Sequence, residues 1–67
     1  MDFELAARYR VTGNFVGLPP LGPFDMTYLG ERAQGGTDFH LFIQADDRFQ
    51  LGIPDHLVGS DFLIEPI

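Results

Sequence analysis

The chain has 67 residues without cysteine or lysine, and its ten acidic residues against four arginines give a formal net charge of −6. A chain of this length forms one domain, residues 1–67, which buries only roughly 60% of the surface that its unfolded form exposes. The composition excludes disulfides and cysteine-ligated zinc, and the negative charge disfavours direct binding to nucleic acid or anionic membranes. With no signal-peptide pattern and no apolar run near the roughly 20 residues of a membrane helix, we expect a cytoplasmic protein.

Apolar side chains must supply the stability of so small a domain. Hydrophobic residues make up 45% of the sequence, and seven phenylalanines and two tyrosines bring the aromatic fraction to 13%. Large aromatic side chains bury the most surface per residue, and disordered chains lack such a composition. We therefore expect a folded domain with an aromatic core.

Alternating apolar and polar residues predict a half-buried strand over residues 2–11. The apolar side chains at its odd positions are Phe3, Leu5, Ala7, Tyr9 and Val11. Alternate residues of a strand share one face, whereas a helix, which the composition of residues 4–8 also favours, would scatter these side chains around its axis. The turn-forming residues 12–14 then predict a hairpin into a second strand over residues 14–18.

A proline-rich segment separates this hairpin from the next one. Residues 19–23 contain three prolines, which cannot continue a central strand, so we expect an extended crossover there. Alternation resumes over residues 24–30 and 37–45, with a flexible connection over residues 31–36. Pairing Gly30 with Thr37 sets three apolar pairs opposite each other: Tyr28 with Phe39, Met26 with Leu41, and Phe24 with Ile43.

The next turn admits two registers. A two-residue loop at Asp46-Asp47 would set Phe49 opposite Gln44 and mix polar with apolar side chains on both faces. A three-residue loop over residues 46–48 avoids this, and its apolar pairs are Ala45 with Phe49, Ile43 with Leu51, and Leu41 with Ile53. The sequence therefore predicts the longer loop, with Asp47 or Arg48 at positive φ.

The C-terminal part predicts one helical turn over residues 54–59 and a last strand over residues 60–65, at an edge of the sheet or against a partner. The fold class is thus mainly β: a small twisted antiparallel sheet of five or six strands, with a partly closed, barrel-like arrangement as an alternative and at most one short helical turn. The expected core residues are Phe3, Leu5, Tyr9, Phe24, Met26, Tyr28, Phe39, Leu41, Ile43, Phe49, Leu51, Ile53, Phe62 and Ile64.

No pattern in the chain indicates catalysis, a cofactor or a metal. Asp38 and His40 share a face, but a metal site needs three or four converging ligands, and the expected register places His40 on a solvated face across from Thr27. His56 reads as a surface residue in a turn. Ser60 lies outside any Gly-x-Ser-x-Gly elbow. We therefore expect a protein that is not an enzyme, with neither cofactor nor metal.

The acidic residues are concentrated in the second half of the chain. Residues 35–67 hold six acids and one arginine, a net charge of −5, whereas residues 1–34 hold four acids and three arginines, a net charge of −1. These charges can serve solubility alone or form a patch for a basic partner. The residues of the predicted patch are Asp38, Asp46, Asp47, Asp55, Asp61 and Glu65.

In size and acidity, the chain resembles the small proteins with which phages block host CRISPR or restriction systems. This resemblance implies a non-enzymatic inhibitor or decoy, a DNA mimic whose carboxylates occupy the basic nucleic-acid-binding surface of a partner complex. The alternative is a structural or accessory subunit that forms a homo- or hetero-oligomer by edge-strand pairing. A charge-driven complex should weaken with salt, whereas an apolar edge-strand interface should not.

Overall fold

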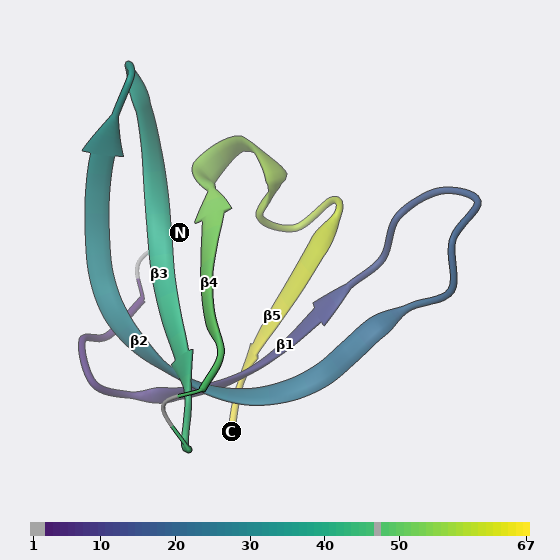
Figure 1. The fold of residues 1–67 in the computed structure, drawn as a ribbon, viewed down its shortest axis with the longest axis horizontal. Coiled ribbons are helices and arrows are strands. Elements are labelled where there is room, and N and C mark those ends of the chain that lie inside the picture. Colours follow the sequence, from purple (N-terminus) through teal and green to yellow (C-terminus); the bar gives the residue numbers. More distant parts are fainter. Residues whose placement is uncertain (1–2, 47) are drawn as a thin grey trace.

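The computed structural model describes residues 3–46 and 48–67, which form one antiparallel sheet of five strands in the order β4-β3-β2-β1-β5 (Figure 1). The elements in chain order are β1 (Arg8–Gly13), β2 (Leu21–Gln34), β3 (Thr37–Gln44), β4 (Gln50–Pro54), the 3-10 turn η1 (Asp55–Leu57) and β5 (Phe62–Pro66). The mainly β antiparallel fold that the sequence predicts is confirmed, and the sheet is not closed into a barrel. No helix in the described part of the chain is long and apolar enough to cross a membrane.

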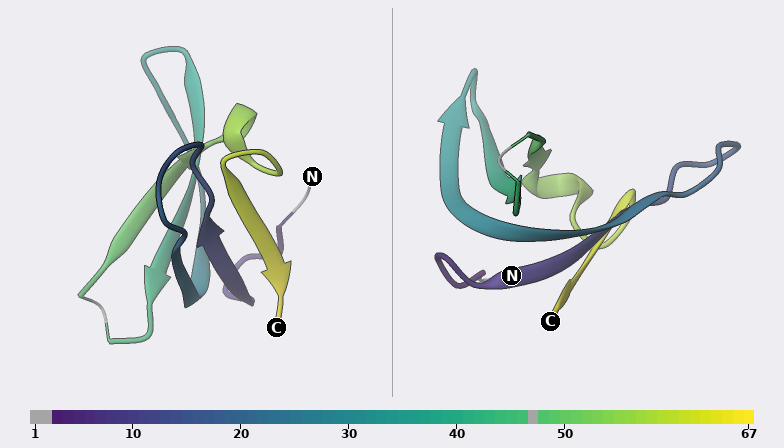
Figure 2. Two further views of the ribbon diagram at one scale, coloured as in Figure 1. Left: turned by 90° about the vertical axis from the view of Figure 1, so that its right-hand side faces the viewer. Right: turned by 60° about the horizontal axis from the view of Figure 1, so that its bottom comes forward.

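The long strand β2 organises the sheet. Its first part pairs with β1, from Leu21 opposite Gly13 to Thr27 opposite Arg8, and its second part pairs with β3. The strand bends strongly along its length, so that the sheet curves around its own core (Figure 2). The β2–β3 hairpin and the loop over residues 14–20 project at opposite ends of β2 (Figure 1).

The β2–β3 hairpin corrects the predicted register. Both Gly35 and Gly36 have positive φ and form a two-residue turn, so β2 extends to Gln34, into the connection expected over residues 31–36. The turn places Glu31 opposite His40. The shorter turn and a one-residue bulge at Leu29 together set the register, and Tyr28 lies opposite Phe42 rather than Phe39. The expected pairs of Met26 with Leu41 and of Phe24 with Ile43 are wrong for the same reason.

The β3–β4 turn adopts the register that the sequence argument rejects. The backbone N–H of Gln44 donates to the carbonyl of Phe49 at 2.9 Å, and Phe42 lies opposite Leu51. The three-residue loop is therefore wrong. That loop would bury the odd residues of β3, whereas the buried residues of this strand are His40 and Phe42. Arg48 does not have positive φ, and Asp47 lies outside the described residues.

The N-terminal third departs most from the sequence-based expectations. The first strand begins at Arg8 instead of residue 2, because the chain turns at Leu5 and Ala6 and runs back over the sheet. Residues 14–18 form a loop rather than a strand, and β1 pairs directly with β2. The expected crossover over residues 19–23 is also wrong in its second half, because β2 already begins at Leu21.

The core occupies the inner face of the bent sheet. Its buried hydrophobic residues are Tyr9, Val11, Met26, Tyr28, Phe42, Ile53 and Phe62. Phe42 is fully buried although the sequence argument left it out, and Leu5, an expected core residue, is 67% exposed. The side chains of Phe39, Leu41 and Ile43, on the other face of β3, are half-buried. The rest of the expected core is buried or packs against it, partly buried.

The C-terminal expectations hold in outline. Residues 55–57 form the short 3-10 turn η1 directly after Pro54, and Gly59 follows it with positive φ. The last strand, β5, pairs with β1 alone and forms one edge of the sheet, with β4 at the other edge. Its side chains alternate as predicted, with Phe62 buried and Ile64 half-buried.

Candidate functional site

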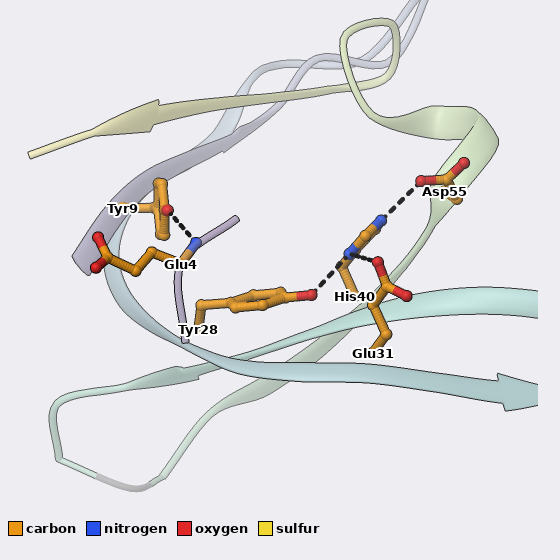
Figure 3. Close-up of polar contacts among 6 residues, drawn as sticks. All are labelled: Glu4, Tyr9, Tyr28, Glu31, His40 and Asp55. Carbon is orange, nitrogen blue, oxygen red and sulfur yellow. Dashed lines mark hydrogen bonds and ion pairs between the residues drawn. The ribbon is translucent and has the colours of Figure 1, made fainter. Parts of the chain in front are cut away.

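A polar cluster around a buried histidine lies where the β2–β3 hairpin meets η1 (Figure 3). Tyr28 and Glu31 come from β2, His40 from β3 and Asp55 from η1. Tyr28 and Glu31 are three residues apart, a spacing that would place them on opposite faces of a regular strand. The extra residue of the Leu29 bulge brings both to the same face as His40.

His40 is the centre of this cluster. Its side chain is only 1% exposed, and both ring nitrogens have partners: Nδ1 lies 3.0 Å from the hydroxyl of Tyr28, and Nε2 lies 2.7 Å from Oδ1 of Asp55. An ionised carboxylate can only accept, so Nε2 carries the proton and donates to Asp55. With Nε2 as the donor to Asp55, Nδ1 is available to accept from the Tyr28 hydroxyl, and this arrangement satisfies all three side chains.

Two carboxylates lie beside His40, one near each ring nitrogen. Besides Asp55, Oε1 of Glu31 lies 3.8 Å from Nδ1. The hydrogen bond from His40 holds the pKa of Asp55 below its ordinary value of 3.8, and it outweighs the opposing effect of desolvation. Burial raises the pKa of Tyr28 above 10.0, with a smaller contribution from the charge of Glu31.

Aromatic rings close the cluster from the side of the core. The ring of Phe3 lies edge-on to His40, with centroids 5.1 Å apart, and also contacts Tyr28 at 5.3 Å and Phe42 at 5.6 Å. Tyr9 meets Phe3 at 5.2 Å, and its hydroxyl accepts a hydrogen bond from the backbone N–H of Glu4 at 2.7 Å. His40 therefore contacts the aromatic rings of Phe3 and Tyr28 and lies beside two carboxylates that are themselves exposed.

The order Asp55–His40–Tyr28 has the form of an orienting acid, a base and a hydroxyl nucleophile. The environment opposes that use, because Tyr28 is 5% exposed and its pKa is raised, whereas an activated nucleophile needs a lowered pKa and access to substrate. The geometry instead suits a structural connection. It ties η1, and with it the link from β4 to β5, to the middle of the sheet.

The acids of the predicted patch do not form one surface. Asp38 lies at the start of β3 opposite Ala33, whereas Asp46 lies in the turn beyond the other end of β3. There, Asp46 lines an open depression of about 430 Å³ together with Arg8 and Asp25. Opposite ends of an eight-residue strand are roughly 25 Å apart, so one compact patch cannot contain both acids.

The remaining members of the predicted patch are also dispersed. Glu65 lies opposite Arg10 of β1, whose other cross-strand neighbour is Asp25, at 3.8 Å. Asp61 is half-buried, and its backbone carbonyl accepts a hydrogen bond from Asn14. Asp47 lies outside the described residues.

Three carboxylates do gather, however, at the end of the sheet that holds His40. Glu31 and Asp55 flank the histidine, and Asp38 lies two residues before it on β3, one step beyond the Phe39–Pro54 pair with which the β3–β4 pairing ends. We call Glu31, Asp38 and Asp55 the acidic end. Glu31 is not among the residues of the predicted patch, and His40, predicted on a solvated face, is buried. The Gly35-Gly36 signal for a two-residue hairpin would have set these two residues opposite each other.

Comparisons with protein-family models, with curated proteins and with solved structures found no match. Among the described residues, no group of three or more histidine, aspartate and glutamate side chains is arranged to hold a metal ion.

Proposed function

We propose that the protein is a non-enzymatic, acidic binding protein that occupies a basic, nucleic-acid-binding surface of a partner complex, as an inhibitor or decoy of the phage anti-CRISPR or anti-restriction type. The observation that carries this proposal is the acidic end. It brings together three carboxylates from β2, β3 and η1 that are scattered in the sequence.

The acidic end is available to a partner. The side chains of Glu31 and Asp55 are 63% and 65% exposed, and Asp38 is exposed as well. In the described part of the chain, no arginine forms an ion pair with any of the three. Their field therefore reaches solvent largely uncompensated, and it would attract arginine and lysine side chains placed to hold phosphates.

The buried cluster also gives the acidic end a fixed shape. The hydrogen bond of 2.7 Å from His40 fixes the carboxylate of Asp55. Since His40 is itself held by the hydroxyl of Tyr28, the carboxylate starts from an ordered position. A partner that binds it loses less conformational freedom than it would with a mobile side chain.

Charge-matched double variants test the proposal. Glu31→Gln with Asp38→Asn removes two charges from the acidic end and leaves Asp55, which holds His40, in place. Asp46→Asn with Glu65→Gln removes two charges elsewhere and is the control. We expect the first pair to weaken binding to the captured partner by roughly tenfold or more at low salt, and the control pair to weaken it much less.

Two further readouts complete this test. Double-stranded DNA should compete with the protein for the partner, and raising the ionic strength should weaken the complex markedly. Equal losses for both double variants would show that only overall charge matters. A complex that DNA does not displace would refute the proposed target surface.

An oligomer built by edge-strand pairing is the second candidate, and the structure favours β4 over the predicted C-terminal edge for it. Because Gln44 bonds to Phe49, the outward backbone groups of β4 belong to Gln50 and Gly52. In β5, the bond from Ile67 to Arg8 turns Pro66 outward, where it offers no N–H. A salt-insensitive complex that Gln50→Pro abolishes would support this candidate.

A further inference from the structure

The chain before β1 forms an arm, residues 3–7, that folds back onto the inner face of the sheet (Figure 3). A tight turn reverses its direction, and the N–H of Ala7 donates to the carbonyl of Glu4 at 3.1 Å. The turn is fixed to β2 by the N–H of Ala6, which donates to the carbonyl of Tyr28 at 2.9 Å. Beyond the turn, the N–H of Glu4 donates to the hydroxyl of Tyr9.

The arm delivers one large side chain to the core. The ring of Phe3 lies within 5.1–5.6 Å, between centroids, of four other rings. These rings belong to Tyr9, Tyr28, His40 and Phe42, and we call the space between them the Phe3 pocket. The pocket is formed by β1, β2 and β3, so it does not depend on which chain supplies the phenylalanine.

The turn that seats Phe3 is strained. Ala6 has φ of 66° and is the one non-glycine residue with positive φ in the described part of the chain. In this conformation the Cβ of an L-residue approaches its own backbone closely, a cost that glycine does not bear. Straightening Ala6 would release this strain, but it would also withdraw Phe3 from the pocket of its own chain.

Two observations favour a straight arm once Phe3 is released. Phe3, Leu5 and Ala7 continue the alternation of β1, so the local sequence favours an extended strand. The edge of β2 beyond Tyr28 is also open on the side of β1. Strand β1 pairs with β2 only as far as Thr27, whereas β2 continues to Gln34, and no strand of the described chain covers that edge. A straightened arm is therefore not blocked by another strand of its own chain.

We propose that two copies of this chain exchange their arms, so that Phe3 of each copy fills the Phe3 pocket of the other. The exchanged arm makes the same ring contacts and the same bond from Glu4 to Tyr9, so the pocket contacts are conserved. Both Ala6 turns lose their strain. Short, strained hinges are the setting in which such exchange arises. This inference does not depend on the proposed partner surface, because the acidic end takes no part in it.

Hinge variants test the exchange by sedimentation over a concentration series. Ala6→Gly removes the strain of the folded-back arm and should raise the dissociation constant of the dimer by roughly a hundredfold, tenfold for each hinge. Ala6→Val disfavours positive φ further and favours an extended strand, so it should lower the dissociation constant. The wild-type series is informative even if the valine variant fails to fold.

The contact itself is tested by isotope-filtered NMR on a mixture of labelled and unlabelled protein at a concentration where dimer is present. We expect NOEs between the Phe3 ring of one copy and the Tyr28 and Phe42 rings of the other. Phe3→Ala should abolish the dimer while leaving β1 to β5 paired. A wild-type chain that stays monomeric at millimolar concentration, or a dimer that persists in Phe3→Ala, would overturn the proposal.

Discussion

The two faces of β3 differ in how deeply their side chains are buried. The odd residues Phe39, Leu41 and Ile43 form the more hydrophobic face, yet they are half-buried, whereas the even residues His40 and Phe42 are 1% and 0% exposed. Burial therefore does not follow the hydrophobicity of the strand taken alone. It follows the register that the Gly35-Gly36 turn and the Leu29 bulge impose, and this register turns a histidine inward together with the partners that satisfy it.

The largest expected effect compares one residue from each face. Phe42→Ala removes a fully buried ring that contacts Phe3, Tyr9 and Tyr28, and should destabilise the protein by roughly 3–5 kcal/mol. Leu41→Ala on the other face should cost about half as much, because that side chain is already partly in water. Urea unfolding monitored by circular dichroism measures both values. A larger loss for Leu41→Ala would show that the inner and outer faces are assigned the wrong way round.

The next largest effect concerns the hydrogen bond between Tyr28 and His40 on the inner face of the sheet. Tyr28→Phe leaves Nδ1 of His40 without its donor, and His40→Leu leaves the Tyr28 hydroxyl without its acceptor, so each should cost roughly 1–3 kcal/mol. The double variant should cost less than the two single losses added together, because neither unsatisfied group remains. A double-mutant cycle in urea measures this coupling. Strict additivity would mean that the hydrogen bond contributes nothing to stability.

The sequence predicts those features of the fold that depend on residues close to one another in the chain. Alternation correctly indicates the antiparallel sheet and the inward side chains of Tyr9, Met26 and Phe62, and the proline and glycine that flank residues 55–58 correctly indicate the η1 turn, because these features depend on neighbouring residues. It fails where one residue changes the phase. A two-residue alternation predicts neither the bulge at Leu29 nor the reversal at Ala6. Each omission also changes the expected position of the residues beyond it.

The candidate site shows the same limit. The sequence predicts that Asp38 and Asp55 are exposed acids. That they lie at the same end of the sheet as Glu31 depends on the hairpin register and on the position of η1. Alternation predicts His40 in solvent because it places the apolar neighbours Phe39 and Leu41 inside. A buried histidine becomes plausible only once its hydrogen-bond partners are known, and those lie 12 and 15 residues away.

A smaller effect tests the turn that sets the register. Gly35 and Gly36 have φ of 59° and 80°, so alanine at Gly36 should cost about 1 kcal/mol through the strain of its Cβ. Asparagine, which tolerates this conformation better, is the matched control and should cost less. Thermal unfolding of the two variants measures the difference. Equal stability of all three chains would mean that this turn does not constrain the hairpin.

The smallest expected effect is a pH dependence that isolates the link between the inner face and η1. The pKa of Asp55 is lower in the folded protein than its ordinary value of 3.8, because His40 donates to its carboxylate. The folded state therefore prefers the ionised form, and this contribution is present above about pH 3.8 and is lost as the pH falls through the folded pKa. Asp55→Asn keeps an oxygen that can accept from His40 but cannot titrate. The free energy of unfolding of the wild type should fall toward that of Asp55→Asn between pH 5 and pH 3, after both are measured at each pH in urea. A difference between the two chains that stays constant over this range would mean that the carboxylate of Asp55 is not held by His40, and η1 would then be attached to the sheet by its apolar contacts alone.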